Sequence, residues 1–203
     1  MCATVALVLV DNGIESQNQD YGASRIILQK GIVSDMINLL IAEELDNQLG
    51  IIPLYQEVKN DIVTPLAYDK MDLLNFINKL DLSENNTFEL SFYQSRQTLQ
   101  TSNLSDKKVF IFLSSTIEYP SKVIYDIATL IDTGSAVYVA CFGSAVDFGS
   151  ILKSEFNDGD CQILIITPEE DFDLSIEKFY LTQFDDNEDE NYKLALQQSL
   201  IEK

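Results

Sequence analysis

The sequence predicts an α/β fold with a doubly wound, mostly parallel central sheet. Apolar runs that contain several Val residues, such as Thr4–Val10 and Ala136–Phe142, alternate along the chain with segments of helical periodicity. Continuous apolar runs are typical of parallel strands buried on both faces, and such strands are joined by helices. Hydrophobic residues make up 46% of the 203 residues, which is enough for a full core.

The elements expected in the first half of the chain follow from apolar runs and from apolar spacings of three and four residues. They are, in order, a strand over Thr4–Val10, a polar loop over Asp11–Tyr21, a helix over Ala23–Glu44, a turn over Asn47–Gly50, a strand over Ile51–Tyr55, a short strand over Glu57–Thr64 that pairs with it, and a helix over Asp69–Leu80. We expect the two helices to bury Ile26, Ile27, Val33, Ile37, Leu40 and Ile41 in the first and Met71, Leu74, Ile77 and Leu80 in the second.

The second half of the chain continues the alternation of strands and helices. Its expected elements are a helix over Thr87–Leu99, a strand over Lys108–Leu113, a helix over Pro120–Ile131, a strand over Ala136–Phe142, a helix over Ala145–Phe156, a strand over Cys161–Ile166 and a helix over Leu174–Leu181. The chain therefore divides into an α/β domain over residues 1–182, an acidic linker over residues 183–187 and a C-terminal segment over residues 188–203.

The charge of the chain excludes two classes of partner. It contains 33 Asp and Glu residues against 13 Lys and Arg residues, which gives a formal net charge of −20. Nucleic acids and anionic membranes both bind positive patches, so we expect neither as a partner. An acidic surface suits a protein partner with basic residues around its binding site.

The N-terminal apolar run and the cysteines have simple structural explanations. No basic residue precedes the apolar run, and Asp11 ends it early, so a buried strand explains it better than a signal peptide. No other apolar run is long enough to span a membrane. Cys2, Cys141 and Cys161 are odd in number, and the last two lie in or beside apolar runs, so we expect buried free thiols in a reducing compartment.

The end of the chain predicts a short helix with an acidic start. The helix dipole favours negative charge at that position. The acidic residues there are Asp185, Asp186, Glu188, Asp189 and Glu190. Residues 193–202 contain good helix formers and no Gly or Pro. Because an isolated helix of this length is marginal in water, we expect much of its order to come from what it binds.

This helix carries a narrow apolar strip on one side. The strip consists of Tyr192, Ala195, Leu196, Ser199 and Leu200. Ala195 has almost no side chain, so a partner surface can approach the backbone closely, and Ser199 can offer a hydroxyl hydrogen bond. The alternative is an amphipathic helix that docks on its own domain.

The order of acids, bulky apolar residue, Ala and Ser resembles a ubiquitin-interacting motif. The residues that the resemblance assigns to ubiquitin binding are Glu188, Asp189, Glu190, Tyr192, Leu194, Ala195, Leu196, Ser199 and Leu200. In such motifs the helix lies on the apolar patch of ubiquitin, and the acidic triplet faces basic residues at the rim of that patch. By this resemblance the triplet steers the encounter more than it holds the complex.

The rest of the chain resembles a von Willebrand factor A domain, and more narrowly the one in the ubiquitin-receptor subunits of the proteasome regulatory particle. The stretches that carry the resemblance are Val10-Asp11-Asn12, Arg25, Asn47-Gln48-Leu49-Gly50-Ile51, Thr64-Pro65, Asn86-Thr87-Phe88, Val109–Ser115 and Phe142-Gly143. The combination with a ubiquitin-interacting motif is more specific than any single stretch. A second ubiquitin-binding motif, which some relatives have, is absent from the printed sequence.

Domains of this type often hold a divalent metal, but the sequence predicts none. The metal loop needs Asp-x-Ser-x-Ser, since a hard cation wants a carboxylate and converging hydroxyls. Here Gly13 and Glu15 stand where the hydroxyls should be, and Leu90 stands where a second loop should supply Thr. The resemblance implies that this end of the domain docks on neighbouring proteasome subunits, with Asp11 as a candidate contact. The alternative for Asp11 is a loop cap after the strand.

The enzyme alternative is an aspartic protease. Asp132-Thr133-Gly134 matches its catalytic loop, but that chemistry needs two carboxylates, so a dimer would be required. The residues before Asp132 also read as a helix, after which Gly134 would be a C-cap. The chain contains no His, and it lacks the phosphate-binding, dinucleotide-binding and nucleophile-elbow patterns.

The sequence therefore predicts a non-catalytic adaptor that uses no cofactor. We expect it to bind ubiquitin and polyubiquitin chains and other regulatory-particle subunits, in the cytoplasm and nucleus. The second hypothesis is a ubiquitin-binding scaffold with an A-type domain that is unconnected to the proteasome.

Overall fold

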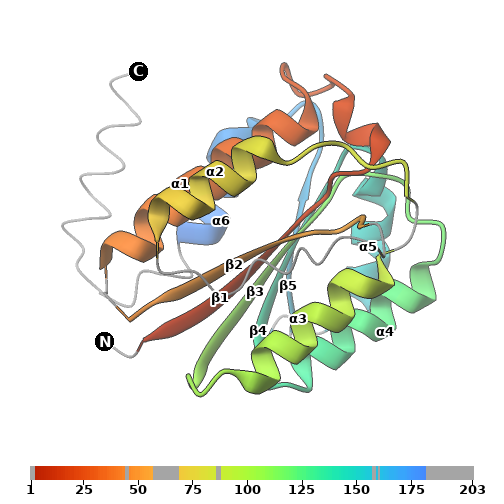
Figure 1. Ribbon diagram of the computed structural model, residues 1–203. Coiled ribbons are helices and arrows are strands. Elements are labelled where there is room, and N and C mark those ends of the chain that lie inside the picture. The colour runs from red at the N-terminus through yellow and green to blue at the C-terminus, as the bar shows by residue number, and fades with distance from the viewer. Residues whose placement is uncertain are drawn as a thin grey trace.

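A five-stranded parallel sheet between two layers of helices forms the body of the protein (Figure 1). The computed structural model describes residues 3–43, 46–56, 69–85, 88–156, 159 and 161–181. The strand order is β2-β1-β3-β4-β5, and all neighbouring strands are parallel. The predicted α/β class and doubly wound sheet are confirmed. The expected strand over Glu57–Thr64, the linker over residues 183–187 and the helix over residues 188–203 lie outside the described residues.

The elements follow one another as the alternating pattern predicts. They are β1 (Thr4–Val10), a short 3-10 helix η1 (Ile14–Gln17), α1 (Arg25–Glu43), β2 (Gln48–Pro53), α2 (Lys70–Lys79), α3 (Glu89–Thr101), β3 (Asp106–Leu113), α4 (Pro120–Ile131), β4 (Ala136–Phe142), η2 (Gly143–Ala145), α5 (Val146–Glu155), β5 (Cys161–Ile166) and α6 (Phe172–Leu181). The expected bounds of β1, β4, β5 and α4 are confirmed.

The largest error in the expected bounds is at β2. The sequence predicts a turn over Asn47–Gly50 and a strand over Ile51–Tyr55, whereas the strand runs from Gln48 to Pro53. Pairing with β1 sets the true bounds, because Gln48 lies opposite Val5 and Pro53 lies opposite Val10 in the parallel register. Backbone pairing between strands that are distant in sequence has overridden the local turn signal.

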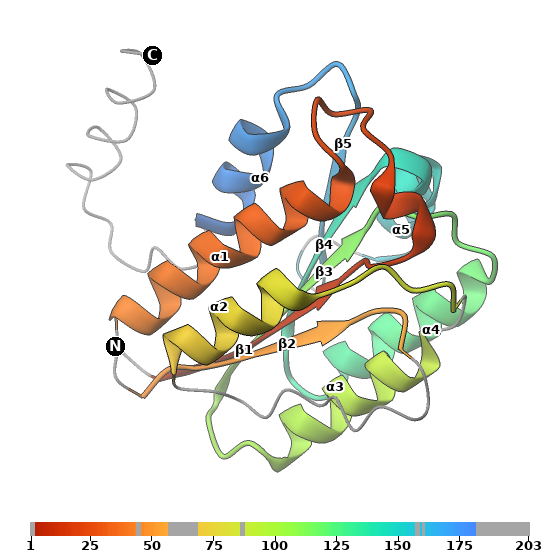
Figure 2. The same ribbon diagram turned by 45° about the horizontal axis from the view of Figure 1, so that its top comes forward.

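The two faces of the sheet carry separate cores. Even-numbered side chains of β1, such as Val8, pack with α1, α2 and α6, and odd-numbered ones, such as Leu7, pack with α3, α4 and α5. This alternation is the period of two expected of a strand that is buried on both faces. Figures 1 and 2 show the two groups of helices on opposite sides of the sheet.

Two expected inward-facing side chains point to solvent instead. Ile27 of α1 is 61% exposed and Met71 of α2 is 62% exposed. Gln29 of α1 and Leu73 of α2 are buried in their place. The buried stripe of each helix is thus rotated from the expected one, because the packing angle on the sheet decides which side is covered.

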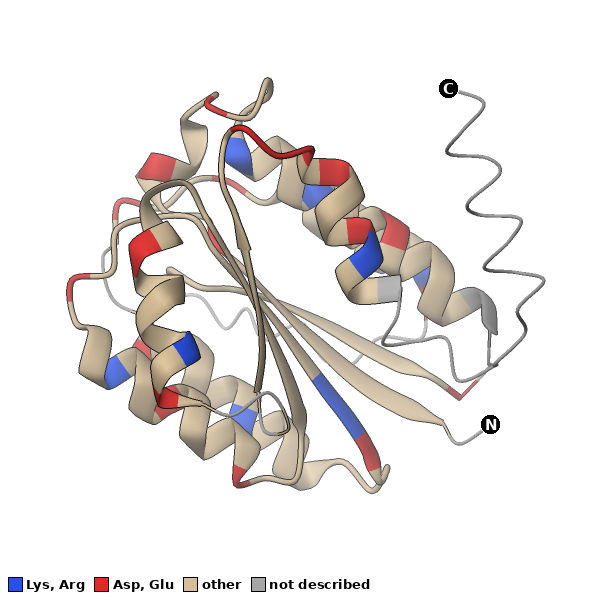
Figure 3. Ribbon diagram, turned by 180° about the vertical axis from the view of Figure 1, so that it is seen from behind, with Lys and Arg blue, Asp and Glu red and all other residues tan. Residues whose placement is uncertain are grey.

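Acidic residues lie in helices of both layers and in the connecting loops (Figure 3). Within the described part of the chain, no helix combines the length and the apolar character that crossing a bilayer requires.

Candidate functional site

The candidate site lies at the carboxyl ends of β1 and β3, which are neighbours in the sheet. From β1 the chain passes through α1 to β2 on one side, and from β3 it passes through α4 to β4 on the other. Connections that leave in opposite directions open a crevice, and ligands of α/β proteins bind at such a switch point. Asp11 follows β1 here, and Ser114 and Ser115 follow β3.

Asp11 is the centre of a hydrogen-bond network that joins these loops. Its Oδ2 accepts the backbone N–H groups of Ser114 at 2.6 Å and Ser115 at 2.7 Å. Its Oδ1 accepts the hydroxyls of Ser115 at 2.8 Å and Ser16 at 3.0 Å, and the N–H of Gly13 at 3.0 Å. The side chain is fully buried, so these bonds replace the water that a charged carboxylate would otherwise lose.

Gln29 of α1 holds the backbone of Asp11 in place. Its side-chain oxygen accepts the Asp11 N–H at 2.8 Å, and its amide nitrogen donates to the Asp11 carbonyl at 3.0 Å. Gln29 is fully buried. Sequence reasoning missed this residue, and a polar residue next to the expected apolar face of α1 was its only signal.

Arg25 is the cation of the site. Its guanidinium forms a two-pronged ion pair with Asp20, with N···O distances of 2.8 and 2.5 Å. It also donates to the Ser114 carbonyl at 2.5 Å and to the Ser144 hydroxyl at 3.2 Å. Arg25 is 4% exposed, so this group connects the loops after β1, β3 and β4 from inside the protein.

Gly143 makes room for that guanidinium. Its φ of +57° lies in the left-handed region, and an added Cβ would lie 2.1 Å from Arg25 Cζ. A side chain at position 143 would therefore be both strained and in collision.

Two carboxyl groups at the rim have lowered pKa values. Hydrogen bonds from Arg25 hold the pKa of Asp20 below its ordinary range. Burial raises the pKa of Glu15, but hydrogen bonds from Ser144 and Thr116 outweigh it, so the pKa of Glu15 is also lowered. A carboxyl whose pKa is lowered by folding stabilises the folded state at pH values above its ordinary pKa. This contribution is lost as the pH falls through the lowered pKa of the folded state.

Comparisons with solved structures identify the fold. The VWA domain of SpRpn10 superposes with a TM-score of 0.67 at 17% identity, over 88% of this chain and 95% of that one. The vWF domain of the type V pili tip protein Mfa5 from Porphyromonas gingivalis gives 0.67 at 8% identity, over 91% and 95%. A von Willebrand factor type A protein from Catenulispora acidiphila gives 0.65 at 11% identity, over 89% of this chain and 42% of that one.

The fold is that of a von Willebrand factor A domain. No protein-family model matches the sequence, and no curated protein sequence matches it. The likeness is therefore one of three-dimensional structure, and the expected A-type fold is confirmed at that level.

The residues of this A-type domain do not fit a divalent metal. The two carboxylate oxygens of Asp11 already accept five protein donors, which occupies the lone pairs that a cation would need. Leu90 lies in the first turn of α3, while the segment against the Asp11 loop is at Ser83, whose N–H donates to the Asn12 carbonyl at 2.7 Å. Among the described residues, no group of three acidic or sulfur side chains is placed to hold a metal.

The structure places Asp11 inside the A-type domain and not on its surface. The role of a loop cap therefore fits its geometry, and any contribution to docking would pass through the loops that it holds. Ile14, on η1 just after Asp11, is 48% exposed and presents apolar surface at the same edge.

Asp132 lies at the C-terminal end of α4, as the helical pattern of the residues before it predicts. It is the C-cap of α4, with its N–H donating to the Ala128 carbonyl, and Gly134 follows with a φ of +78°. The C-cap is thus Asp132 and not Gly134 as expected, but the expected helix end, with a left-handed Gly134 just beyond it, is confirmed. Cys141 and Cys161 are free and buried, as expected, and burial raises the pKa of the Cys141 thiol.

All nine residues that the resemblance assigns to ubiquitin binding lie outside the described residues.

Proposed function

We propose that this chain is a non-catalytic polyubiquitin receptor of the proteasome regulatory particle, active in the cytoplasm and nucleus. The C-terminal helix captures ubiquitin on modified substrates, and the A-type domain docks between parts of the particle. The observation that carries the proposal is the order of parts, in which an A-type fold is followed by an acidic triplet and a helical pattern centred on Ala195. The likeness to the SpRpn10 domain supports it at the level of the fold.

Binding by a single helix of this kind is weak, because its interface is far below the standard size. Several ubiquitin units on one chain, together with other receptors in the same assembly, raise the effective affinity without new contacts. The proposal therefore predicts much tighter binding to polyubiquitin than to single ubiquitin.

The ubiquitin-binding half is tested by a double substitution, Ala195→Arg with Ser199→Arg. Large charged side chains would fill the gap that admits ubiquitin, so the shifts of its apolar patch in NMR titrations should disappear. The matched control is Gln197→Arg with Gln198→Arg, which adds the same charge on the other side of the helical pattern. If wild-type protein leaves the ubiquitin spectrum unchanged, or both variants bind equally, this half is wrong.

The proposed docking of the A-type domain is tested at the edge formed by the carboxyl ends of β1 and β3, where Asp11 lies. Ile14→Asp should reduce co-purification of regulatory-particle subunits, because it places a charge on the exposed apolar contact. Ile151→Asp is the control, since Ile151 is 42% exposed on α5. Unchanged co-purification in both variants would contradict the proposal that the domain docks through this edge.

A ubiquitin-binding scaffold outside the proteasome is the second candidate. It is favoured because the same fold occurs in proteins such as a pilus tip protein, so the fold alone does not indicate which assembly this chain joins. Ubiquitin binding without any co-purified regulatory particle would support this candidate.

A further inference from the structure

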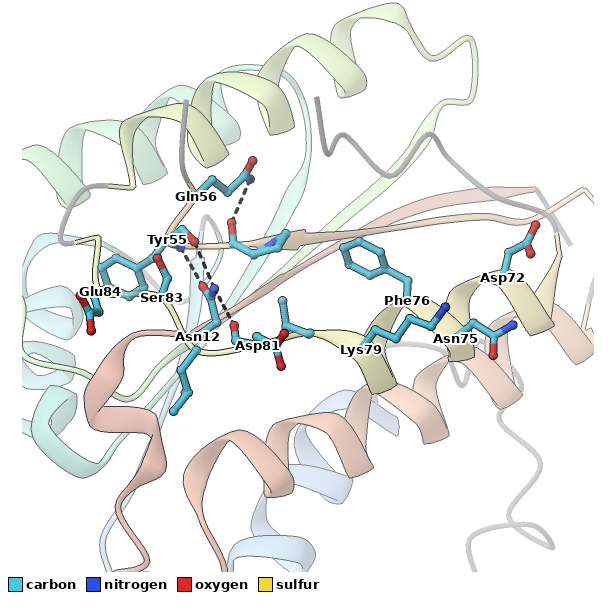
Figure 4. A pocket seen from close by; sticks show the side chains of 13 residues that line it. Asn12, Tyr55, Gln56, Asp72, Asn75, Phe76, Lys79, Asp81, Ser83 and Glu84 are labelled. Carbon is cyan, nitrogen blue, oxygen red and sulfur yellow. Dashed lines mark hydrogen bonds between the residues drawn. The ribbon is translucent and has the colours of Figure 1, made fainter. Parts of the chain in front are cut away.

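A large groove lies beside the outer strand β2, on the side of α2. It encloses about 800 Å³. Its lining includes the side chains of Pro53, Tyr55, Phe76 and Leu80, which offer apolar surface. Figure 4 shows Phe76 reaching from α2 into the space beside β2. The volume is within the range of sites that hold small molecules or short peptide segments.

The walls of the groove are fixed by Asn12, the residue after Asp11. Its side-chain oxygen accepts the Tyr55 N–H at 2.9 Å, and its amide nitrogen donates to the carbonyls of Tyr55 at 3.1 Å and Asp81 at 3.2 Å (Figure 4). These bonds tie the end of β2 to the segment after α2. The groove is thus formed before a partner arrives, which lowers the entropic cost of binding.

The rim of the groove is acidic at both ends. Asp72 lies at one end and Glu84 at the other, as Figure 4 shows, and Asp81 lies between them along the chain. All three are exposed. Lys79 is the one cation among the described lining residues, so the carboxylates outnumber it.

We infer that this groove binds a segment of a protein partner that carries an apolar side chain flanked by Lys or Arg. The apolar side chains of the lining accept the central side chain, and the separated carboxylates favour cationic groups on both sides of it, which a peptide can present. The net charge of −20 adds long-range attraction for such a segment. The inference does not depend on the C-terminal helix and holds for any role of the A-type domain.

The experiment measures binding of a fluorescent hexapeptide with Leu and Phe at its centre and two Lys on each side. The test variant of the full chain is Asp72→Lys with Glu84→Lys. The control is Asp147→Lys with Glu155→Lys, which makes the same charge change at exposed positions of α5, and both Asp72 and Asp147 lie in the first turn of a helix. Fluorescence anisotropy gives the affinity, and circular dichroism checks the fold.

The expected result is binding to wild type and control, with about tenfold weaker binding to the test variant, since each reversed charge pair contributes a fraction of a kcal/mol. A peptide with Ser in place of Leu and Phe should also bind more weakly. NMR shifts should map to α2 and the segment at Ser83. Equal weakening in both variants, or equal binding of both peptides, would show only general charge attraction and overturn the inference. Absence of binding to wild type would also overturn it.

Discussion

The carboxylate of Asp11 accepts hydrogen bonds from backbone and hydroxyl donors on the loops after β1 and β3. Bonds to a charged group contribute about 1.5–3 kcal/mol each, and removing the acceptor also leaves buried N–H groups without a partner. The free energy of unfolding therefore depends strongly on this side chain, and so does the shape of the edge that the proposed function uses for docking.

Asp11→Ala should lower the free energy of unfolding by about 3 kcal/mol or more. Urea denaturation followed by circular dichroism measures the change. Asp147→Ala, at an exposed position in the first turn of α5, should change it by less than about 1 kcal/mol, because only an interaction with the helix dipole is lost. A similar small loss at both positions would contradict the central role of Asp11.

Gly143 gives a second prediction at the residue scale. Gly143→Ala should cost roughly 3 kcal/mol, because the Cβ would collide with the buried Arg25 guanidinium as well as strain the backbone. Gly134→Ala is the control, since its φ is also positive but nothing lies within 4 Å of the added Cβ. It should cost about 1 kcal/mol, from backbone strain alone. Equal losses of unfolding free energy would show that Arg25 moves aside freely.

At the scale of elements, α6 packs on the face of the sheet that α1 also covers, through Ile176 and Tyr180. The same contact brings acids together. Burial and then the nearby Asp173 of α6 raise the pKa of Asp35 on α1. An acid with a raised pKa destabilises the folded state when it is ionised, so the penalty is present at neutral pH and disappears as the pH falls through the folded pKa.

Asp173→Asn should therefore raise the free energy of unfolding at pH 7 relative to a matched change. The matched change is Asp147→Asn, because both residues lie in the first turn of a helix and both lose the same interaction with the helix dipole. The expected difference is about 0.5 kcal/mol or less, and it should disappear as the pH falls through the raised pKa of Asp35, because a protonated Asp35 is not repelled. A difference that persists in acid would point to a cause other than charge repulsion.

At the scale of the whole molecule, the net charge of −20 destabilises the compact folded state. Like charges on the helices of both layers repel one another, and dissolved salt screens that repulsion. The same charge favours encounters with basic partners, so it affects stability and association in opposite ways.

The melting temperature should rise as NaCl increases from about 0.01 M to about 0.15 M, over which the screening length falls from about 30 Å to about 8 Å. Differential scanning calorimetry at pH 7 measures the change. Binding of the Lys-flanked peptide should weaken over the same range, because screening also removes the attraction. A melting temperature that falls with salt would mean that ion pairs such as Arg25–Asp20 contribute more to stability than the repulsion between acidic residues removes.

The sequence by itself determined the fold class, the presence of the five strands that the structure describes and the bounds of several elements. β1, β4 and β5 are continuous apolar runs with polar neighbours, and α4 begins at Pro120 and is followed by Gly134, so each end has a local chemical cause. The A-type fold was identified from a resemblance spread along the chain, and Asp11 was singled out by the same route.

Only the tertiary structure decided which side chains meet. It set the start of β2 at Gln48 through pairing with β1, turned Ile27 outward and buried Gln29, and brought Asp11 against Ser114 and Ser115, more than a hundred residues away. The physical reason is the range of the forces involved. Local periodicity and capping act within a few residues, whereas strand register, helix rotation and hydrogen bonds between loops depend on the packing of segments that are remote in sequence.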